Sequence, residues 1–550
     1  MFQPRSRLVP GLVITLALFG AVVAGLMISG SGAAVAASPE GAASTQDPDG
    51  RALYLKHCAS CHGERGFGDG DAAYLLYPRP RDFSKYHFRL VSTSNGVPSD
   101  EDLFQVVTRG MLGSGMPPHQ HLSEAERKSV VKEVRRLMTE EGMKRLLEEA
   151  QRDGDEMDEA TARDVAFKTP GPRVDLPSAV ASTPELIAEG RVSYVRNCSL
   201  CHDLDGTGRS RSDMKDSLDH PLFARDFTAG IMKGGTEAVD IWRRIRCGMP
   251  GTPMPAAPIG DRETWALVHY VRSMIRPGAQ ERLAQRPLRL DAQRVSAALT
   301  TDPAADVWKT VPARWLSMTP LWWKEPRVEG VLLQAAHDGR SLALRLVWED
   351  ASRDADQSGA ERFSDAAAVQ WSRQENPPFF AMGEKGQVVD IWYWRAVYQE
   401  DQGGWQDVAR AHPRVVNDID ASLRKPPFGS HDKHSNNEMS AYDPLFLTAW
   451  GANNPVADPK RPTPVETLHA GGFGTLSPRL PPFSKTDGRA RHERGFWELV
   501  IIRSLDDGGA GLSLSAGAEV SCAFAVWNGT AGNRNGEKNV TIWHRLSIGR

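Results

Sequence analysis

The chain begins with a single long apolar run. Residues 11–28 read GLVITLALFGAVVAGLMI, with Arg5 and Arg7 before the run and small residues after it. A basic start, an apolar stretch and a small-residue site are features of a secretory signal, and this run is also just long enough to span a bilayer. We expect 1–37 to be a cleaved signal peptide, or 8–28 to be retained as an N-terminal membrane anchor. Either way the rest of the chain lies outside the cytoplasm.

Two periodicities divide the remainder. Amphipathic stretches with helical spacing occur before about residue 280: one begins at Ser123 with Glu126 three residues later, a capping-box pattern, and another is TWALVHYVRSM. From about residue 287, apolar positions alternate and β-branched and aromatic residues become frequent. Turn residues separate the alternating segments, which are 341–350, 365–373, 388–396, 496–505, 519–529 and 539–548. The pattern predicts a helical half followed by two packed antiparallel sheets.

Composition excludes several classes of function. At about 150 residues per domain, 550 residues suggest three to four domains. The 66 basic and 69 acidic residues give a net charge of −3, so no basic face for nucleic acid is expected. Six cysteines are too few for a disulfide scaffold. No nucleophile–base set or phosphate loop is evident, so no hydrolytic or transferase site is predicted.

Four of the six cysteines lie in two Cys-x-x-Cys-His motifs. In this spacing two thiols can add to the two vinyl groups of a haem while the histidine binds its iron. Zinc would need two more ligands at similar spacing, and a thiol redox motif would not need the histidine. We therefore predict two covalently bound haem c groups, attached through Cys58, Cys61 and His62 and through Cys198, Cys201 and His202.

The two motifs lie inside an internal repeat. A Gly-Arg pair and a tyrosine precede each motif at the same offsets, and an Arg-Asp-Phe triplet recurs at 81–83 and 225–227. A Met-Pro pair recurs at 116–117 and 254–255. The repeat resembles a duplicated cytochrome c domain of the small all-helical type.

That resemblance covers residues 46–150 and 182–278. The family places a methionine on the second axial position of the iron, which implies Met116 and Met254 here. Arg81 and Arg225 are candidates to pair with haem propionates, because a guanidinium matches a carboxylate, although ordinary surface salt bridges are an equal alternative. Other axial candidates nearby are Met111, Met249, Met232, His119 and His121.

The C-terminal half, 287–550, is predicted to be an all-β antiparallel sandwich. Five phrases within it resemble the haem-binding γ subunit of ethylbenzene dehydrogenase and related periplasmic molybdenum enzymes of the dimethyl-sulfoxide-reductase family. These phrases are Glu361–Ala366, Pro378–Gly383, Gly472–Leu476, Phe524–Gly529 and Gly536–Val540.

In that family a non-covalent haem b lies between the sheets, held by a methionine and a lysine. The matching phrases assign these roles to Met382 and Lys538. A lysine binds iron only as the neutral amine, so burial and the metal must together displace a proton whose ordinary pKa is near 10.4. Without the resemblance, a packed loop methionine and a solvated lysine would be the simpler interpretation. His544 and Lys385 are the rival ligands.

Some features have no place in this scheme. The loop at roughly 398–470 is long enough to suggest a functional role or an interface. His431 and His434 have an HxxH spacing without a third ligand. Cys247 and Cys522 are left over in different domains, and we expect both to be buried free thiols.

Together these patterns predict a periplasmic three-haem electron-transfer protein. Its β domain would dock to an iron–sulfur subunit of a molybdenum oxidoreductase, and its cytochrome c domains would pass electrons to another cytochrome or a membrane complex. The alternatives are a free-standing electron carrier, a dihaem peroxidase, and a haem- or ligand-sensing sandwich. A peroxidase needs an iron with an open or displaceable ligand, whereas both repeats offer the same Met-Pro loop.

Overall fold

The computed structural model describes most of the chain after the N-terminal segment. Within that part, no helix is both long and apolar enough to cross a membrane. The predicted signal or anchor at 1–37 lies outside the described residues, as do His431 and His434 in the long loop. The described residues are 48–549, except for 86–87, 358, 379–381, 404–461, 480–485, 507–511 and 513.

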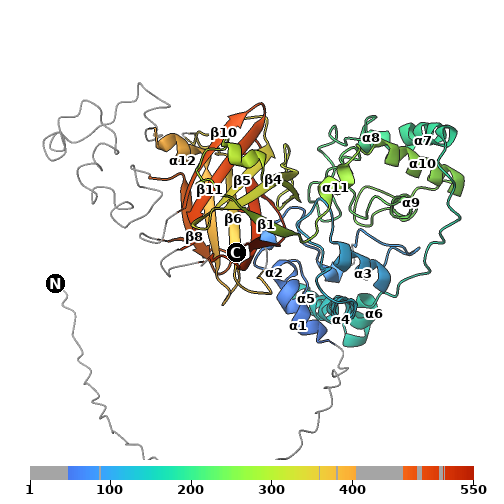
Figure 1. Ribbon diagram of the computed structural model, residues 1–550. Helices are drawn as coiled ribbons and strands as arrows, with labels where there is room; N and C mark the ends of the chain where they lie inside the picture. The colour runs from blue at the N-terminus through green and yellow to red at the C-terminus, as the bar shows by residue number, and fades with distance from the viewer. Residues whose placement is uncertain are drawn as a thin grey trace, which may run out of the picture. The chain divides into compact units, whose positions relative to one another are not determined.

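Two sets of four helices follow the same order in the helical half (Figure 1). In each set one helix ends at the residue before the first cysteine of a motif, a short helix carries the second cysteine and the histidine, and two longer helices follow. The first set is α1 (Gly50–His57), α2 (Ala59–His62), α3 (Asp100–Arg109) and α4 (Glu124–Arg136). The second is α7 (Pro184–Asn197), α8 (Ser199–His202), α9 (Ala238–Cys247) and α10 (Asp261–Met274). The other helices here are α5 (Gly142–Asp153), α6 (Glu159–Ala166) and α11 (Ala279–Leu283).

A glycine lets the first and last helices of each set cross closely. A Cβ on Gly50 of α1 would lie 2.3 Å from the backbone oxygen of Ser129 on α4. A Cβ on Gly190 of α7 would lie 2.0 Å from the backbone oxygen of Ala266 on α10. Both distances are shorter than any allowed contact, so the repeated glycine is required by the packing. The predicted capping box at the start of α4 is present.

Fourteen strands form the C-terminal half among the described residues. The hydrogen-bonded order is β10-β11-β5-β4-β1-β14-β12-β6-β7-β8-β9, with β2, β3 and β13 attached to this path. Their bounds are β1 (Arg289–Arg294), β2 (Arg314–Ser317), β3 (Thr319–Pro320), β4 (Gly330–His337), β5 (Ser341–Glu349), β6 (Ala366–Ser372), β7 (Val389–Arg395), β8 (Val465–Ala470), β9 (Ser477–Pro478), β10 (Thr486–Glu493), β11 (Phe496–Ser504), β12 (Glu519–Trp527), β13 (Asn539–Val540) and β14 (His544–Ile548). The short helix α12 (Ala396–Asp401) follows β7.

The strand pairing differs from the predicted antiparallel sandwich at one place. β1 pairs in parallel with β14 along its first half and in parallel with β4 at its end. It therefore passes from one sheet to the other and joins them. The expectation of a wholly antiparallel domain is wrong here, because β1 enters from the helical half and runs in the same direction as both neighbours. The predicted segment 539–548 is also divided into two strands.

The interior of the β domain is filled by tryptophans from both sheets. The fully buried indoles are Trp348, Trp371, Trp392, Trp394 and Trp497. Residues in a strand alternate between faces, so their neighbours in the sequence point to the other side of the sheet. On that opposite face β6, β7 and β12 carry a separate apolar cluster.

Asp365 connects three parts of the β domain. Its buried carboxylate accepts hydrogen bonds from the backbone N of Asp354 at 2.7 Å, from Trp497 Nε1 at 3.0 Å and from the backbone N of Gly529 at 2.8 Å. An alanine here would leave these donors unsatisfied, at a cost of about 1–3 kcal/mol for each that finds no water. We expect Asp365→Ala to lower the free energy of unfolding by about 3 kcal/mol in urea denaturation.

The matched control for this prediction is Asp306→Ala. Asp306 forms only an exposed pair with Lys309, so its loss should leave the urea midpoint unchanged. Equal midpoints for both variants would contradict the role assigned to Asp365.

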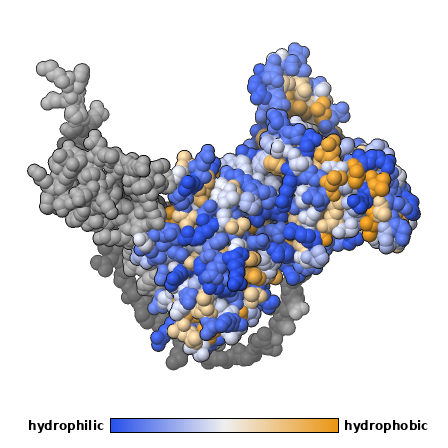
Figure 2. Space-filling view, turned by 90° about the horizontal axis from the view of Figure 1, so that it is seen from above, coloured by the Kyte–Doolittle hydropathy of each residue, from blue (hydrophilic) through white to orange (hydrophobic). Residues whose placement is uncertain are grey.

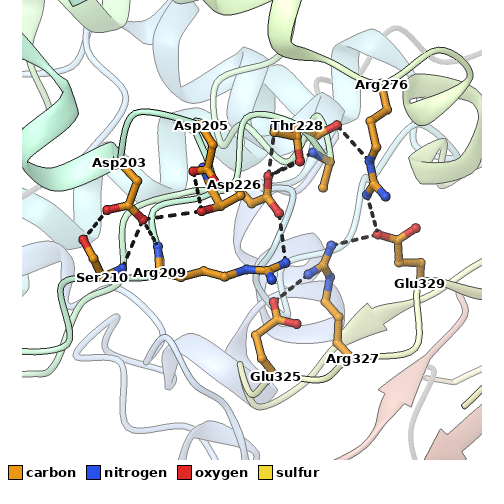
Figure 3. A network of polar contacts seen from close by, with 12 residues as sticks. Asp203, Asp205, Arg209, Ser210, Asp226, Thr228, Arg276, Glu325, Arg327 and Glu329 are labelled. Atoms are coloured by element: carbon orange, nitrogen blue, oxygen red, sulfur yellow. Dashed lines mark hydrogen bonds and ion pairs between the residues drawn. The ribbon is translucent and has the colours of Figure 1, made fainter. Parts of the chain in front are cut away.

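A polar network joins the second helical set to the β domain (Figure 3). Arg276, which follows α10, lies 3.5 Å from Glu329, which precedes β4. Glu329 also pairs with Arg327 at 3.0 Å and with Arg282 at 3.3 Å. Two of these three guanidiniums, those of Arg276 and Arg282, come from the helical half and hold its end against the first sheet.

Candidate functional site

The first Cys-x-x-Cys-His motif opens onto a cavity. Cys58, Cys61 and His62 line one wall, and Met116 with its proline lines another. Apolar side chains, among them Phe83, Leu103 and Val130, make up much of the rest of the lining, which suits a flat apolar group such as a porphyrin. The structure thus brings together the predicted attachment and axial residues of the first repeat.

The ring of His62 is prepared to bind a metal through one nitrogen. Its Nδ1 lies 3.1 Å from the backbone oxygen of Arg81, and since a carbonyl can only accept, Nδ1 carries the proton. The Nε2 lone pair is then free for a metal. Burial lowers the pKa of His62 to about 4, so the ring is neutral at pH 7. Phe83 stacks on it at 4.8 Å between centroids.

The second motif also opens onto a cavity. Cys198, Cys201, His202 and Met254 line it together. His202 stacks on Phe227 at 4.3 Å, as His62 does on Phe83. Burial lowers the pKa of His202, and the backbone of Arg225 opposes this shift.

The loops that carry the predicted axial methionines have the same backbone bond in both repeats. The backbone N of Met111 donates to the oxygen of Met116 at 3.1 Å, and Met249 N donates to Met254 O at 3.0 Å. The rivals Met111 and His119 also line the first cavity, and Met249 and Met232 line the second, whereas His121 does not line the first. Position alone therefore leaves several axial candidates beside Met116 and Met254.

The thiols do not have the properties of a redox or zinc motif. Burial raises the pKa of Cys58 to about 12 and those of Cys61 and Cys198 to about 11. Reactive and metal-binding cysteines need a lowered pKa, because the thiolate is the active form. In the part of the chain that the structure describes, neither motif belongs to a group of three converging metal-binding side chains. Covalent attachment of a haem through thioether bonds suits these thiols better than zinc binding or thiol redox chemistry.

Basic side chains converge between the two cavities. Arg81, Arg89 and Lys233 line the first cavity, and Arg225 and Lys233 line the second. Burial lowers the pKa of Arg81 to about 10 and that of Arg225 to about 9. One ion pair within the cluster joins Arg89 to Asp216 at 3.0 Å. Buried cations need anionic partners, and haem propionates would provide them.

Sequence reasoning found Arg81 and Arg225 but missed Arg89 and Lys233. Burial lowers the pKa of Lys233 strongly, and its side chain reaches both cavities. A signal was present: each missed cation lies eight positions after the arginine of the Arg-Asp-Phe triplet, since 89 − 81 and 233 − 225 both equal 8. A longer alignment of the two repeats would have shown it.

A third cavity is lined by both Met382 and Lys538. Its floor is the outer face of β6, β7 and β12, with Ala368, Tyr393 and Ala525 among the lining residues. This face is turned away from the tryptophan core. The resemblance implied a haem between the sheets, and that position is wrong for these residues, because the indoles fill the space between the sheets.

Both predicted ligands of the third cavity have unusual surroundings. Met382 has a positive φ of 67°, a strained conformation for a side chain of this size. Hydrogen bonds hold it there: its N donates to Gln370 Oε1 at 2.9 Å, and Gly472 N donates to its oxygen at 2.8 Å. Lys538 is 9 % exposed, and burial lowers its pKa to about 8. Its Nζ lies 5.0 Å from the centre of the Trp527 ring.

The rivals for this cavity lie elsewhere. His544 is buried beside β1, where its Nδ1 accepts from the backbone N of Leu288 at 3.2 Å. Lys385 is exposed and does not line the cavity. The leftover thiols are free as expected, with Cys522 fully buried and Cys247 half-buried at the end of α9.

One short segment contacts residues that line each of the three cavities. The backbone oxygen of Leu321, after β3, accepts from Tyr77 N at 2.8 Å, and its N donates to the oxygen of Lys538 at 2.9 Å. Thr319 Oγ1 donates to the oxygen of Ser114, two residues before Met116, at 3.2 Å. The Trp323 ring lies 4.2 Å from the guanidinium carbon of Arg225. We call residues 319–323 the connecting segment.

Two family models match the chain. The model described as cytochrome C oxidase, cbb3-type, subunit III, matches residues 45–132 and 185–271, one match over each repeat. The model described as ethylbenzene dehydrogenase matches residues 305–539. These are the families that the sequence resemblances predicted for the two halves.

Individual proteins show similarity to parts of the chain. A provisionally named respiratory nitrate reductase haem subunit of Haloferax mediterranei is 26 % identical over 255 residues, covering 45 % of this chain and 68 % of that protein. The chlorate reductase subunit gamma of Ideonella dechloratans is 28 % identical over 274 residues, covering 48 % and 85 %. A solved reducing HAO-like protein complex of Kuenenia stuttgartiensis is 32 % identical, with 42 % of this chain and 96 % of that one covered and a TM-score of 0.35. The chain thus joins two cytochrome c domains to a domain of the ethylbenzene dehydrogenase family.

Proposed function

We propose that the chain is the electron-transfer subunit of a periplasmic molybdenum oxidoreductase and carries two haem c groups and one haem b. The similarity to haem and gamma subunits of nitrate and chlorate reductases supports this class of partner. Haem, when bound, supplies a reversible one-electron couple whose potential the protein tunes. The domains would be 46–150, 182–278 and 287–550, after an exported or anchoring segment at 1–37.

The observation that carries the proposal is the order of the three cavities. Tyr74 and Leu75 line the β-domain cavity, while the next residue, Leu76, lines the first cytochrome cavity. Lys233 lines both cytochrome cavities. Among the residues that the structure describes, none lines both the β-domain cavity and the second cytochrome cavity. The first cytochrome cavity therefore lies between the other two in the proposed route.

The chain's own residues would hold each group at both faces and along its acidic edge. His62 with Met116 and His202 with Met254 would hold the iron of the haem c groups, and Lys538 with Met382 would hold that of the haem b. The basic cluster would neutralise propionates. Filled axial positions leave no place for a substrate, which suits electron transfer and not turnover.

The two attachment motifs differ in their exposure. Cys61 of the first motif packs against the apolar cluster on the outer face of the β domain. In the second domain Leu200 is 75 % exposed and Leu204 is 69 % exposed. Figure 2 shows patches of hydrophobic residues among hydrophilic ones on one face of the molecule. We propose that the second cytochrome domain meets an external redox partner and that the β domain meets the iron–sulfur subunit.

The haem content tests this proposal directly. A reduced-minus-oxidised spectrum with pyridine extraction should show two covalent haems and one extractable haem per chain. Molybdenum should accompany the chain when it is purified from its native source. Two covalent haems without an extractable one, or rapid turnover of hydrogen peroxide, would contradict the proposal.

Lys233 should set the potentials of both cytochrome centres. Paired with haem propionates, Lys233 would keep its proton despite its burial, and a nearby positive charge favours the reduced state, which has one more electron. We expect Lys233→Met to lower both haem c potentials by about 59 mV, a tenfold change in a one-electron equilibrium. Potentiometric titration measures this, and the haem b potential should stay unchanged.

The control for Lys233 is Lys128→Met on the exposed side of α4, where the lysine is 62 % exposed and pairs with Glu124. Screening by water should leave all three potentials unaltered. A shift in only one haem c potential after Lys233→Met would show that Lys233 does not serve both centres.

A further inference from the structure

Three histidines of the first cytochrome domain lie together outside its predicted ligand set. His57 is the last residue of α1, and His119 and His121 follow Met116 in the loop before α4. Ring centroids are 6.2 Å apart for His57 and His119, 5.3 Å for His57 and His121, and 5.6 Å for His119 and His121. One nitrogen of each ring lies within 4.8 Å of the others.

These distances are close to those of a metal site. At a zinc–nitrogen bond of ~2.0–2.1 Å, tetrahedral ligands lie roughly 3.3 Å apart. Small side-chain rotations would close the difference, since two of the three rings are on a loop. Among the described residues this is the one group of three histidine, cysteine or acidic side chains that meets the distance requirement.

The cluster contains a buried nitrogen without a hydrogen-bond partner. His119 is 7 % exposed, and its Nδ1 is buried without a hydrogen-bond partner among the described residues. Burial, reinforced by neighbouring imidazoles, lowers the pKa of His57 to about 4 and that of His119 to about 3. The rings are neutral at pH 7 and offer lone pairs. The charged groups that face them are Lys56, Glu126 and Arg127.

The second cytochrome domain is an internal comparison. His57 precedes its motif as Asn197 precedes the other, and the positions three and five after the axial methionine are Ala257 and Ile259 instead of His119 and His121. The same fold therefore forms without any of the three imidazoles. The histidines are not a requirement of the cytochrome c fold.

We propose that His57, His119 and His121 form a binding site for one divalent transition-metal ion of the zinc or copper class. Three neutral imidazoles are typical ligands for these ions. His121 is exposed, so a fourth position remains open to water on that side. Bound metal would fasten the loop after Met116 to the end of α1. The set contains neither His62 nor Met116, although His57 and His119 also line the first cytochrome cavity.

The test uses the full haem-loaded protein, freed of loose metal with a chelator and then titrated with Zn²⁺ in a calorimeter and with Cu²⁺ under electron paramagnetic resonance. We expect one tight equivalent and a copper signal with several nitrogen ligands. Two variants should each raise the Kd for the metal at least ~100-fold: His121→Ala, at an exposed position, and His57→Asn, which copies the second domain. Residues that only support metal ligands typically change affinity by ~10–100-fold.

Two comparisons make the result decisive. A variant with His431→Ala and His434→Ala should still bind one metal ion tightly. This result would show that the tight binding does not come from that HxxH pair. Tight binding that survives in both His121→Ala and His57→Asn would overturn the proposal. The proposal would also be overturned if the wild type bound no added metal and His119→Ala changed the axial-ligand signature of the haem c spectrum. That outcome would assign His119 to the haem iron.

Discussion

A chain in which Cys58→Ser and Cys61→Ser are combined is expected to contain two haems instead of three. The second covalent haem and the extractable haem should remain, because their cavities are lined by other residues. Electron exchange between these two should nevertheless slow markedly, because the lost group lies in the middle cavity. Stopped-flow reduction, followed at the separate absorption bands of haem c and haem b, measures the exchange.

Two further variants complete this experiment. Cys198→Ser with Cys201→Ser also removes one haem, but from the end of the row, so exchange between the first haem c and the haem b should persist. Cys247→Ser, a half-buried thiol that lines none of the three cavities, should change neither haem content nor rate. Equal exchange rates in the two double variants would refute the proposed order.

Lys538→Leu is expected to abolish binding of the extractable haem while both covalent haems stay. Leucine keeps the apolar contacts of the lysine stem but has no nitrogen for the iron. The matched control is Lys385→Leu, an exposed lysine three residues after Met382, which should keep the haem. Pyridine extraction of the purified variants gives the result, and retention of the haem in Lys538→Leu would remove the lysine from the ligand set.

Haem uptake by the β domain should also depend on pH. The iron binds only the neutral amine, and burial lowers the pKa of Lys538 to about 8. Below pH 8 a proton competes with the iron, so the affinity should fall about tenfold for each pH unit. Above pH 8 the affinity should level off. Titration of haem-free protein with haem measures this slope, which should vanish in Lys538→Leu and persist in Met382→Leu.

The sequence by itself determined the local chemistry. Two thiols and a histidine within five residues can only be close together, so the attachment motifs required no tertiary information. The spacing of Trp392 and Trp394 two positions apart likewise predicted a strand that places both indoles on one face. The repeat predicted the helical order, because equal spacing of Gly50 and Gly190 from the cysteines reflects one packing requirement.

Only the tertiary structure decided which residues from distant parts of the chain meet. Lys233 serves two cavities because the two repeats face each other there, and no pattern within one repeat contains that contact. The Met382 cavity lies on the outer face of its sheet because bulky indoles occupy the inner one. His57 meets His119 and His121 only because α1 ends beside their loop. Periodicity specifies which face of an element is apolar, whereas the packing of whole elements specifies what that face contacts.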